Sequence, residues 1–427
     1  MFWYTDVGSD LFMVKPIIFH IDVNSAYLSW EAAYQLDRGS PLDLRTIPSV
    51  IGGNEKSRHG IVLAKSIPSK KFNIQTGETL FSARSKCPNL VVVPPRYNLY
   101  MKCSKAMVDL LRGYSPTIQR YSIDEVFIDF TGSLNNTRPV DLAFEIKERI
   151  KNELGFTVNI GIGSNKLLAK MASEFEKPDK IHTLFPDDIP SKMWPLPVSE
   201  LFMVGSATKR KLHSRGIMTI GELAKCDPKY IHSWLKSHGL LIWNYANGVE
   251  NSVVRNESPP IKGLGNSTTM PSDIIDSRTA QMVLLSLIEN VSIRLRESKK
   301  CAQVISVSLK NSDFVSYSHQ RKLQTPTDST NLFYKQAKDL FDEMWKGEPL
   351  RHLGVHFSHL CSNDFFQLSM FQEQSEKQRA LDKTIDVLRT KYGNDSVVRS
   401  CFLESGLRPL MGGVLEEEDY PMMSSLL

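Results

Sequence analysis

The sequence predicts an α+β fold divided among several domains. At 427 residues the chain is too long for one compact core, and its apolar and charged fractions are those of ordinary globular proteins. Residues 16–175 and 263–361 each read in the order β-α-β-β-α-β. That order predicts, in each module, an antiparallel sheet backed by helices, as in the ferredoxin-like split β-α-β arrangement.

The first module begins with residues 16–23 (PIIFHIDV), an apolar, β-rich run that ends in a carboxylate. Residues 121–130 (YSIDEVFIDF) alternate like a hairpin strand. Further strands are predicted at 60–65, 90–93 and 156–162, and helices at 26–36, 97–112, 139–153 and 165–175.

Proline and glycine become frequent after Lys177-Pro178, and residues 186–250 hold short helical pieces. The polar stretch at 251–262 is the best candidate for a linker. The second module then has predicted strands at 264–270, 302–309, 313–323 and 350–357 and helices at 277–296 and 329–345. One more helix is predicted near 375–392, followed by an acidic tail.

Composition excludes several classes of protein. No apolar run approaches the roughly 20 residues that span a bilayer, and the acidic start does not resemble a signal peptide. Six widely spaced cysteines show no metal-binding pattern, which favours reduced thiols in a cytoplasmic protein. The formal charge of +5 is unevenly spread, because acidic residues outnumber basic ones after residue 363. A basic body suits a polyanionic partner.

Three carboxylates are candidates for a metal centre. Asp22 ends the first strand, and Asp124 and Glu125 lie at the turn-like entry to a neighbouring strand. Nucleotidyl transfer is commonly served by two divalent ions about 4 Å apart, and carboxylate oxygens suit Mg²⁺. Adjacent strand residues point to opposite faces, so both residues can serve one site only at a bulge or strand end. The alternative is that Asp22 caps a helix and the pair forms a solvated turn.

The stretches HIDVNSAYLSWE (20–31) and YSIDEVFIDFTG (121–132) resemble the two signature stretches of the Y-family DNA polymerases, the lesion-bypass enzymes that include bacterial DNA polymerases IV and V. The resemblance continues in CPNLVVVPPRYNLY (87–100), NIGIGSNKLLAKMASEFEKPD (159–179) and VGSATKRKL (204–212), and covers residues 16–372 in order. It implies a right-hand polymerase. Its parts would be an N-terminal extension (1–13), a palm (14–29 and 88–178), small fingers (30–87), a helix-hairpin-helix thumb (179–252), a linker (253–262), a βαββαβ little finger (263–361) and a C-terminal tail (362–427).

The resemblance assigns the catalytic and metal-binding roles to Asp22, Asp124 and Glu125, with the backbone carbonyl of Val23 as a further ligand. It implies two Mg²⁺ ions, which Mn²⁺ can replace. Tyr27 falls where the family places its steric gate against ribonucleotides; the alternative is an ordinary core aromatic. Ala26 stands where members commonly carry a second aromatic residue.

The resemblance also implies lysines for the triphosphate of the incoming nucleotide. Lys166, at the start of a helix, matches the family lysine directed at the β- and γ-phosphates, and a helix start favours anions. The alternative is a solvated surface lysine. Lys70 and Ile67 stand where the family usually offers Arg and Tyr. Lys70 keeps the charge without the fork of arginine. Ile67 cannot donate a hydrogen bond, so Ser66 or a backbone amide is the candidate replacement.

Two further regions resemble DNA-binding elements of the family. The hairpin around Gly205, with Lys209 and Arg210, would contact phosphates without reading sequence. Arg321 is the leading candidate for a backbone contact from the little finger. The other candidates are Lys211 and Arg215 in the thumb and Arg294, Arg296, Lys299, Lys300, Lys310 and Lys322 in the little finger.

Residues Gln367, Leu368, Ser369, Met370 and Phe371 resemble the short peptide with which bacterial proteins bind the sliding clamp. The alternative is a strand that continues the little finger. Altogether the sequence predicts a low-fidelity DNA-directed DNA polymerase, monomeric, acting on primer–template DNA and dNTPs in translesion synthesis and damage-induced mutagenesis. A catalytically silent DNA- or clamp-binding accessory protein and a nucleotidyl cyclase are the alternatives.

Overall fold

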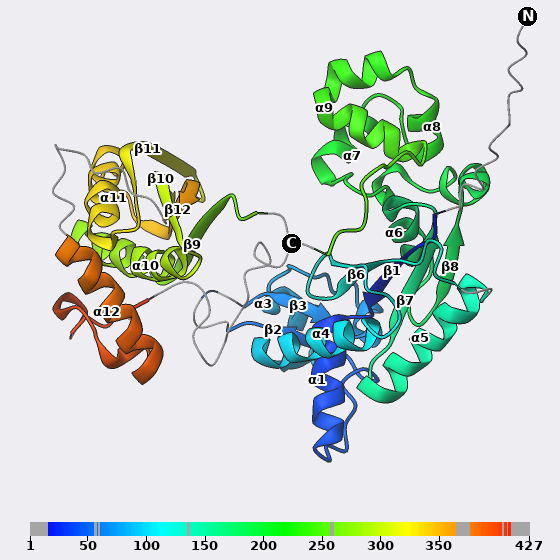
Figure 1. Ribbon diagram of the computed structural model, residues 1–427, viewed down its shortest axis with the longest axis horizontal. Coiled ribbons are helices and arrows are strands. Elements are labelled where there is room, and N and C mark those ends of the chain that lie inside the picture. The colour runs from blue at the N-terminus through cyan, green and yellow to red at the C-terminus, as the bar shows by residue number, and fades with distance from the viewer. Residues whose placement is uncertain are drawn as a thin grey trace, which may run out of the picture.

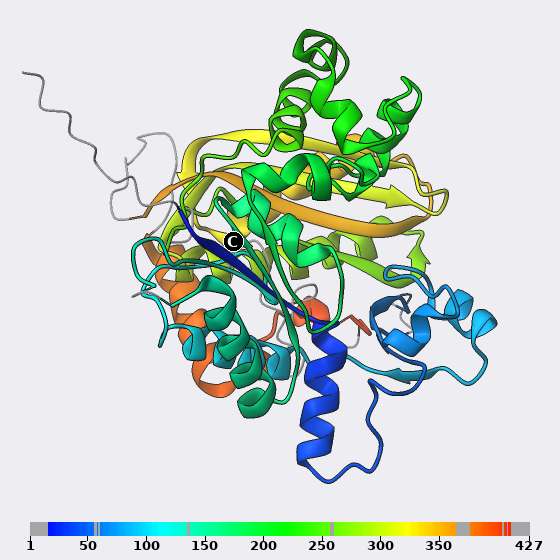
Figure 2. The ribbon, with the colours of Figure 1, turned by 90° about the vertical axis from the view of Figure 1, so that its right-hand side faces the viewer.

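The computed structural model describes residues 16–54, 58, 60–134, 137–256, 260–363, 376–403, 405–407 and 409–410. Palm, fingers and thumb lie together, and the little finger forms a separate sheet-and-helix body (Figure 1). In Figure 2 the fingers (light blue, right) lie beside the N-terminal end of helix α1 (Ala26–Asp37), and the thumb helices (green) lie at the top. Arg58 of the fingers makes an ion pair of 2.5 Å with Asp273 of the little finger.

The palm is built on a five-stranded sheet in the order β5-β6-β1-β7-β8. Strand β1 runs antiparallel to both of its neighbours, whereas β7 and β8 are parallel. The strands are β1 (Ile18–Val23), β5 (Ile118–Arg120), β6 (Glu125–Asp129), β7 (Val158–Gly163) and β8 (Ile181–Leu184), and the helices are α1 (Ala26–Asp37), α4 (Tyr97–Leu111), α5 (Pro139–Leu154) and α6 (Lys166–Glu174).

The two faces of the palm sheet differ in chemistry. Phe19 and Ile21 point into a large apolar core that α4 and α5 complete. His20 and Asp22 alternate with them and so lie on the opposite face, against which α6 packs. Gly161 on β7 permits that close packing, because a Cβ atom there would lie 1.9 Å from the carbonyl oxygen of Ala169.

The fingers contain a small sheet in the order β3-β2-β4 and two short helices. The elements are β2 (Ser49–Gly52), β3 (Val62–Lys65), α2 (Ile67–Lys70), α3 (Leu80–Lys86) and β4 (Val91–Val93). Two expected boundaries change. Strand β4 pairs with β2 rather than with the palm, and β8 joins the palm sheet although it lies in the range expected for the thumb.

The thumb is helical. Its apolar core joins residues of α7, α8 and α9 to the short turns that precede them. The elements are the 3₁₀ turns η2 (Pro186–Asp188) and η4 (Val198–Glu200), the π turn η3 (Ile189–Met193), α7 (Ser206–His213), α8 (Ile220–Lys225) and α9 (Pro228–Ala246). Within α9 the backbone leaves the helical conformation at Lys236, with φ 56° and ψ −141°.

The little finger is a four-stranded antiparallel sheet in the order β11-β10-β12-β9, as the second β-α-β-β-α-β pattern predicts. Residues Ile305, Val307 and Leu309 of β10 point into the core with the helices α10 and α11. The elements are β9 (Gly263–Ile274), α10 (Ser277–Glu297), β10 (Lys300–Asn311), β11 (Ser316–Thr327), α11 (Thr330–Met344) and β12 (Leu350–Ser362).

Helix α12 (Glu376–Tyr392) and the turns η5 (Asn394–Ser396) and η6 (Ser400–Phe402) extend the little finger. The helix docks through ion pairs: Arg296 of α10 lies 2.5 Å from Asp386, and Arg379 lies 3.0 Å from Asp328. The expectation that Arg296 contacts DNA is therefore wrong, because its side chain is only 8 % exposed and is bound to α12.

No helix in the described ranges is long and apolar enough to cross a membrane. All six cysteines are free thiols.

Candidate active site

The three predicted carboxylates meet at the edge where β1 and β6 are paired. Asp22 is the penultimate residue of β1 and lies opposite Glu125, the first residue of β6. Asp124 lies in the bend just before β6, and its carbonyl accepts a hydrogen bond from the amide of Val23. The strand end required for both neighbouring carboxylates to serve one site is therefore present.

Each carboxylate is held through one of its oxygens. Lys177 Nζ lies 2.5 Å from Asp22 Oδ2, and Lys170 Nζ lies 2.6 Å from Glu125 Oε2. Asp124 Oδ1 accepts a hydrogen bond of 2.5 Å from the hydroxyl of Ser122. Among the described residues, no ammonium or hydroxyl group makes a comparable contact with the other oxygen of these three carboxylates.

The donor chemistry of this trio fits hard divalent ions, which prefer several carboxylate oxygens. Among the described residues no three such groups already lie at ligand distance of one point. Two of the three carboxylates bind ammonium groups: Glu125 binds Lys170, and Asp22 binds Lys177.

Burial and neighbouring charges separate the pKa values of the three acids. Burial raises the pKa of Asp22 to about 6, against the opposing effect of Lys177. Burial also raises the pKa of Asp124, which the hydrogen bond from Ser122 partly offsets. Burial acts the same way on Glu125, but contacts with His20 and Lys170 outweigh it and lower its pKa to about 2.

His20 lies behind Glu125 and was not predicted. Its side chain is completely buried, with Nε2 3.5 Å from Glu125 Oε2 and Nδ1 2.8 Å from the hydroxyl of Ser173 on α6. Burial lowers the pKa of His20. The alternation of β1 was the available signal, because His20 lies two residues before Asp22 and therefore on the same face.

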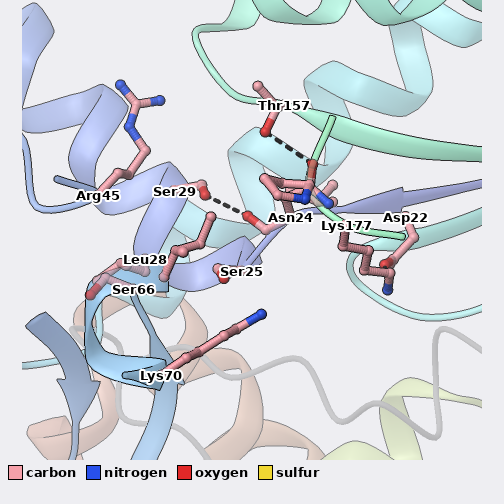
Figure 3. Close-up of a pocket in the computed structure, with 13 residues that line it drawn as sticks. Asp22, Asn24, Ser25, Leu28, Ser29, Arg45, Ser66, Lys70, Thr157 and Lys177 are labelled. Carbon is pink, nitrogen blue, oxygen red and sulfur yellow. Dashed lines mark hydrogen bonds and ion pairs between the residues drawn. The ribbon is translucent and has the colours of Figure 1, made fainter. Parts of the chain in front are cut away.

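A cavity of about 550 Å³ opens between palm and fingers, and we call it the palm–fingers cavity. Asp22 and Asp124 line it together with Tyr27, Lys70 and Lys177. A smaller recess beside it shares Asp22, Lys70 and Lys177 (Figure 3). In that view Lys70 extends from the fingers into the recess, and Lys177 lies next to Asp22. With Lys65, three lysines and two carboxylates thus line the palm–fingers cavity.

Tyr27 forms part of the cavity wall from the first turn of α1. Its ring stacks on Tyr100 of α4, with centroids 4.7 Å apart and planes 12° apart, and meets Tyr97 edge to face. Two aromatic neighbours therefore fix the ring beside Asp22 and Asp124, where the predicted gate must lie.

The fingers supply one of the two predicted phosphate contacts. Lys70 is exposed and lines the cavity. Ser66 is almost completely buried, and its hydroxyl donates to the carbonyl of Ile47 and accepts from the amides of Ser49 and Ser69. The hydroxyl of Ser66 is thus engaged in capping α2, so its suggested role at the triphosphate is not supported.

Lys166 does not lie in the palm–fingers cavity. Its ammonium group donates to Gln119 and to the carbonyl of Val253, in the segment that leaves the thumb. Lys177, rather than Lys166, lines that cavity, beside Asp22. Asn24 helps to fix its loop, since Asn24 Oδ1 accepts from the amide of Asp179. No spacing in the sequence distinguishes Lys177, because only the packing of α6 brings it beside Asp22.

A second cavity of about 460 Å³ lies between palm and thumb, and we call it the palm–thumb cavity. Asp124 and Glu125 line it with Lys170, Tyr121 and Phe202. Asp124 therefore faces both cavities, with Tyr27 and Asp22 on one side and Glu125 on the other.

The predicted DNA contacts of the thumb lie at the start of α7. Gly205 is the residue before the helix and is exposed, and a Cβ atom there would meet nothing within 4 Å. Arg210 is exposed and Lys209 is half-buried on the same helix. Arg215 instead lies over the ring of Trp234 and bonds to the carbonyl of Lys211.

Arg321 does not lie on the open face of the little-finger sheet. It pairs in register with Ile305, which points to the helices, and it makes ion pairs with Glu343 and Asp339 of α11. Lys322 alternates with it, is exposed and lies on the open face. Lys310 of β10 lies on the same open face, because it alternates with Leu309, which points into the core. The suggested clamp peptide, residues 367–371, lies outside the described residues.

Family models match most of the chain. The model of the impB/mucB/samB family matches residues 21–174, and the model of its C-terminal domain matches residues 261–370. The helix-hairpin-helix motif of the same family matches residues 186–217.

Relatives agree with these matches over nearly their full length. A protein named DNA polymerase IV from Clostridium acetobutylicum is 52 % identical over 392 residues, which cover 92 % of this chain and 99 % of the relative. DNA polymerase IV of Acetivibrio thermocellus is 35 % identical over 92 % of this chain and 98 % of its own. DNA polymerase IV 2 of Bacillus subtilis is also 35 % identical, over 92 % of this chain and 95 % of its own.

A solved structure shares the fold. The Y-family DNA polymerase chimera Dbh-Dpo4(243-245)-Dbh aligns with a TM-score of 0.70 at 23 % identity, covering 81 % of this chain and 100 % of that chain. From the motif order, the domain matches and these relatives, the chain belongs to the impB/mucB/samB family of Y-family DNA polymerases.

Proposed function

We propose that Asp22, Asp124 and Glu125, with the carbonyl of Val23, bind two Mg²⁺ ions with which this DNA-directed DNA polymerase adds dNTPs to a primer 3′-hydroxyl. Members of the family are metal-dependent, and primer–template DNA and dNTPs are the substrates of such enzymes. The choice of Mg²⁺, replaceable by Mn²⁺, rests on the oxygen donors. The observation that carries the proposal is that Asp124 faces both the cavity with Tyr27 and the cavity with Glu125.

The divalent ions, when bound, lower the pKa of the attacking hydroxyl and neutralise phosphate charge. The remaining work falls to side chains of the chain. Lys70 and Lys177, on opposite sides of the palm–fingers cavity, hold the triphosphate. The ring of Tyr27, fixed by Tyr100, lies under the sugar and excludes a 2′-hydroxyl. Glu125 serves the ion on the primer side.

Duplex DNA binds through phosphate contacts. The exposed amide groups at Gly205 and the charges of Lys209 and Arg210 suit the backbone without reading bases. On the little finger, Lys310 and Lys322 replace Arg321 as the favoured contacts, because they share the face that α10 and α11 leave uncovered. Such binding should weaken steeply with salt.

The physiological role that family membership supports is low-fidelity translesion synthesis, with damage-induced (SOS) mutagenesis as its setting. Residues 367–371 would tether the enzyme to the sliding clamp. A monomer in the cytoplasm is the simplest arrangement for these partners. The alternative, a catalytically silent accessory protein, is disfavoured because all three carboxylates and the cavity lysines Lys70 and Lys177 are present.

Primer extension by Asp124→Ala tests the metal assignment. The variant should bind a labelled primer–template as the wild type does, yet should extend it at least about 100-fold more slowly, as for loss of an essential catalytic group. The exposed Asp109→Ala, with its side chain 47 % exposed on α4, is the matched control and should extend normally. Near-normal extension by Asp124→Ala would refute the assignment.

A further inference from the structure

Lys170 is the one lysine of α6 whose ammonium group lies against a predicted catalytic carboxylate. Its Nζ lies 2.6 Å from Glu125 Oε2, and the residue is 9 % exposed. The close packing of α6 on Gly161 of β7 brings it there. The packing of α6 on the sheet therefore places Lys170 beside Glu125, so the contact is not that of a flexible surface side chain.

Aromatic rings hold the ammonium group of Lys170 from two domains. Its Nζ lies 5.3 Å from the ring centre of Tyr121 in the palm and 5.5 Å from that of Phe202 in the thumb. Phe202 in turn stacks on Tyr245 of α9. Cation–π contacts of this kind keep a cation in place where water is partly excluded.

The contacts of Glu125 divide its two oxygens. Lys170 bonds to Oε2, and His20 approaches the same atom at 3.5 Å. Neither contact uses Oε1, the oxygen left for a divalent ion. The positive charge of Lys170 thus lies on one oxygen of Glu125, while a divalent ion would bind the other oxygen.

We infer that Lys170 is a positioning residue that anchors Oε2 of Glu125 and, through its charge, keeps the affinity of Glu125 for the primer-side divalent ion low. The inference rests on the proposed function, in which Asp124 and Glu125 are metal ligands. Anchoring favours a high maximal rate because it fixes Oε1. The charge opposes binding of the ion, so the two effects of Lys170 have opposite consequences for rate and for affinity.

The test replaces Lys170 with methionine, which keeps the length of the side chain but removes the charge and the hydrogen bond. Mn²⁺ is titrated by electron paramagnetic resonance into the full-length protein bound to a dideoxy-terminated primer–template. Lys170→Met should bind Mn²⁺ at least about tenfold more tightly, because a unit charge a few ångströms from a divalent ion matters even at the dielectric constant of water. With an extendable primer, its half-saturating Mg²⁺ concentration and its maximal rate should both fall.

Two further variants separate charge from structure. Lys170→Arg keeps the charge and should bind Mn²⁺ as weakly as the wild type. Lys166→Met removes a lysine one turn earlier on α6, which bonds to Gln119 and Val253, and should leave Mn²⁺ binding unchanged. Unchanged or weaker Mn²⁺ binding by Lys170→Met, or tight binding by Lys170→Arg, would overturn the inference.

Asp124→Ala distinguishes this failure from failure of the proposed function. If wild type and Asp124→Ala bind Mn²⁺ equally, the carboxylates are not the metal site and the proposed function itself fails. If Asp124→Ala loses Mn²⁺ while Lys170→Met matches the wild type, only the role of Lys170 is refuted.

Discussion

The ammonium group of Lys177 lies 2.5 Å from Oδ2 of Asp22, although the two residues are 155 positions apart in the chain. Asp22 lies near the end of the central strand β1 and Lys177 follows α6, so the fold alone brings them together. Burial acts to lower the pKa of Lys177, but Asp22 outweighs it and raises that pKa. Lys177 is therefore a permanent cation at the edge of the palm–fingers cavity, where a triphosphate would meet it.

Replacing Lys177 with methionine should raise the KM for dNTP at least about tenfold, because a hydrogen bond to a charged group contributes about 1.5–3 kcal/mol. Single-nucleotide incorporation at varied dNTP concentration measures this effect. Lys166→Met is the matched control and should leave the KM for dNTP unchanged. A large effect of Lys166→Met with none of Lys177→Met would return the phosphate role to the residue that sequence reasoning favoured.

Tyr27→Ala should lower the preference for dNTPs over rNTPs at least about tenfold, since discrimination of this kind depends on a clash with the wrong substrate. The stacked ring of Tyr100 holds Tyr27 in the cavity wall, so the clash comes from a fixed ring. Incorporation of matched dNTP and rNTP pairs gives the ratio. Tyr27→Phe keeps the ring and should keep the preference; an unchanged ratio for the alanine variant would exclude Tyr27 as the gate.

Asp22→Asn should stabilise the metal-free protein at pH 8 but not at pH 4. Burial raises the pKa of Asp22 from its ordinary value of 3.8 to about 6, so the folded state binds this proton more tightly than the unfolded chain does. Ionising Asp22 therefore lowers the free energy of unfolding. This loss is absent below pH 4, grows as the pH rises from 4 to 6, and is complete above 6.

The asparagine variant avoids this loss, although Lys177 then lacks its partner. The pKa of about 6 already includes the attraction of Lys177 and corresponds to a cost of about 3 kcal/mol, so the variant should gain up to about 3 kcal/mol at pH 8 relative to pH 4. Urea unfolding in the presence of a chelator, at pH 4 and pH 8, measures the difference. Asp109→Asn, exposed on α4, controls for loss of a surface charge. Equal effects of Asp22→Asn at the two pH values would contradict the prediction.

The strands and helices were largely predictable because their apolar periodicity is strong. Helix α4 occupies Tyr97–Leu111, one residue short of the predicted range. The strand predicted at 121–130 begins only at Glu125, because Ser122 bonds to Asp124 and holds a bend before it. Because of the bend, Asp124 and Glu125 both line the palm–thumb cavity, and a propensity for strand gives no sign of it.

Contacts between elements were less predictable than the elements themselves. A helix start favoured Lys166 as a phosphate ligand, but sequence does not say which end of α6 faces the cavity. The register of β11 on β10 likewise decides that Arg321 faces α11 while Lys322 faces outward. The first case concerns which end of a correctly predicted helix faces the cavity, and the second concerns the direction of a side chain within a correctly predicted strand.

The clamp peptide stays a prediction, because residues 367–371 lie outside the described part of the chain. Replacing Gln367 and Phe371 with alanine should leave primer extension without the clamp unchanged but should abolish stimulation by the bacterial sliding clamp. Tethering raises the effective concentration of polymerase at the primer end, so the loss should appear as shorter products. Replacing the neighbouring Glu373 and Gln374 is the control. Equal stimulation of both double variants would refute the assignment.

Lys236→Gly should stabilise the thumb by about 1 kcal/mol, because a residue held in a sparsely populated backbone region costs of order 1–3 kcal/mol and glycine avoids most of that cost. Lys236 has φ 56° and ψ −141° inside α9, and its exposed side chain contributes little packing that the substitution would remove. Thermal unfolding followed by tryptophan fluorescence suits the test, because Trp194, Trp234 and Trp243 belong to the thumb core. Ser237→Gly is the matched control: its backbone is helical, so the same new residue should lower the midpoint there. If both glycine variants lower the midpoint, the conformation at Lys236 carries no strain that glycine can relieve.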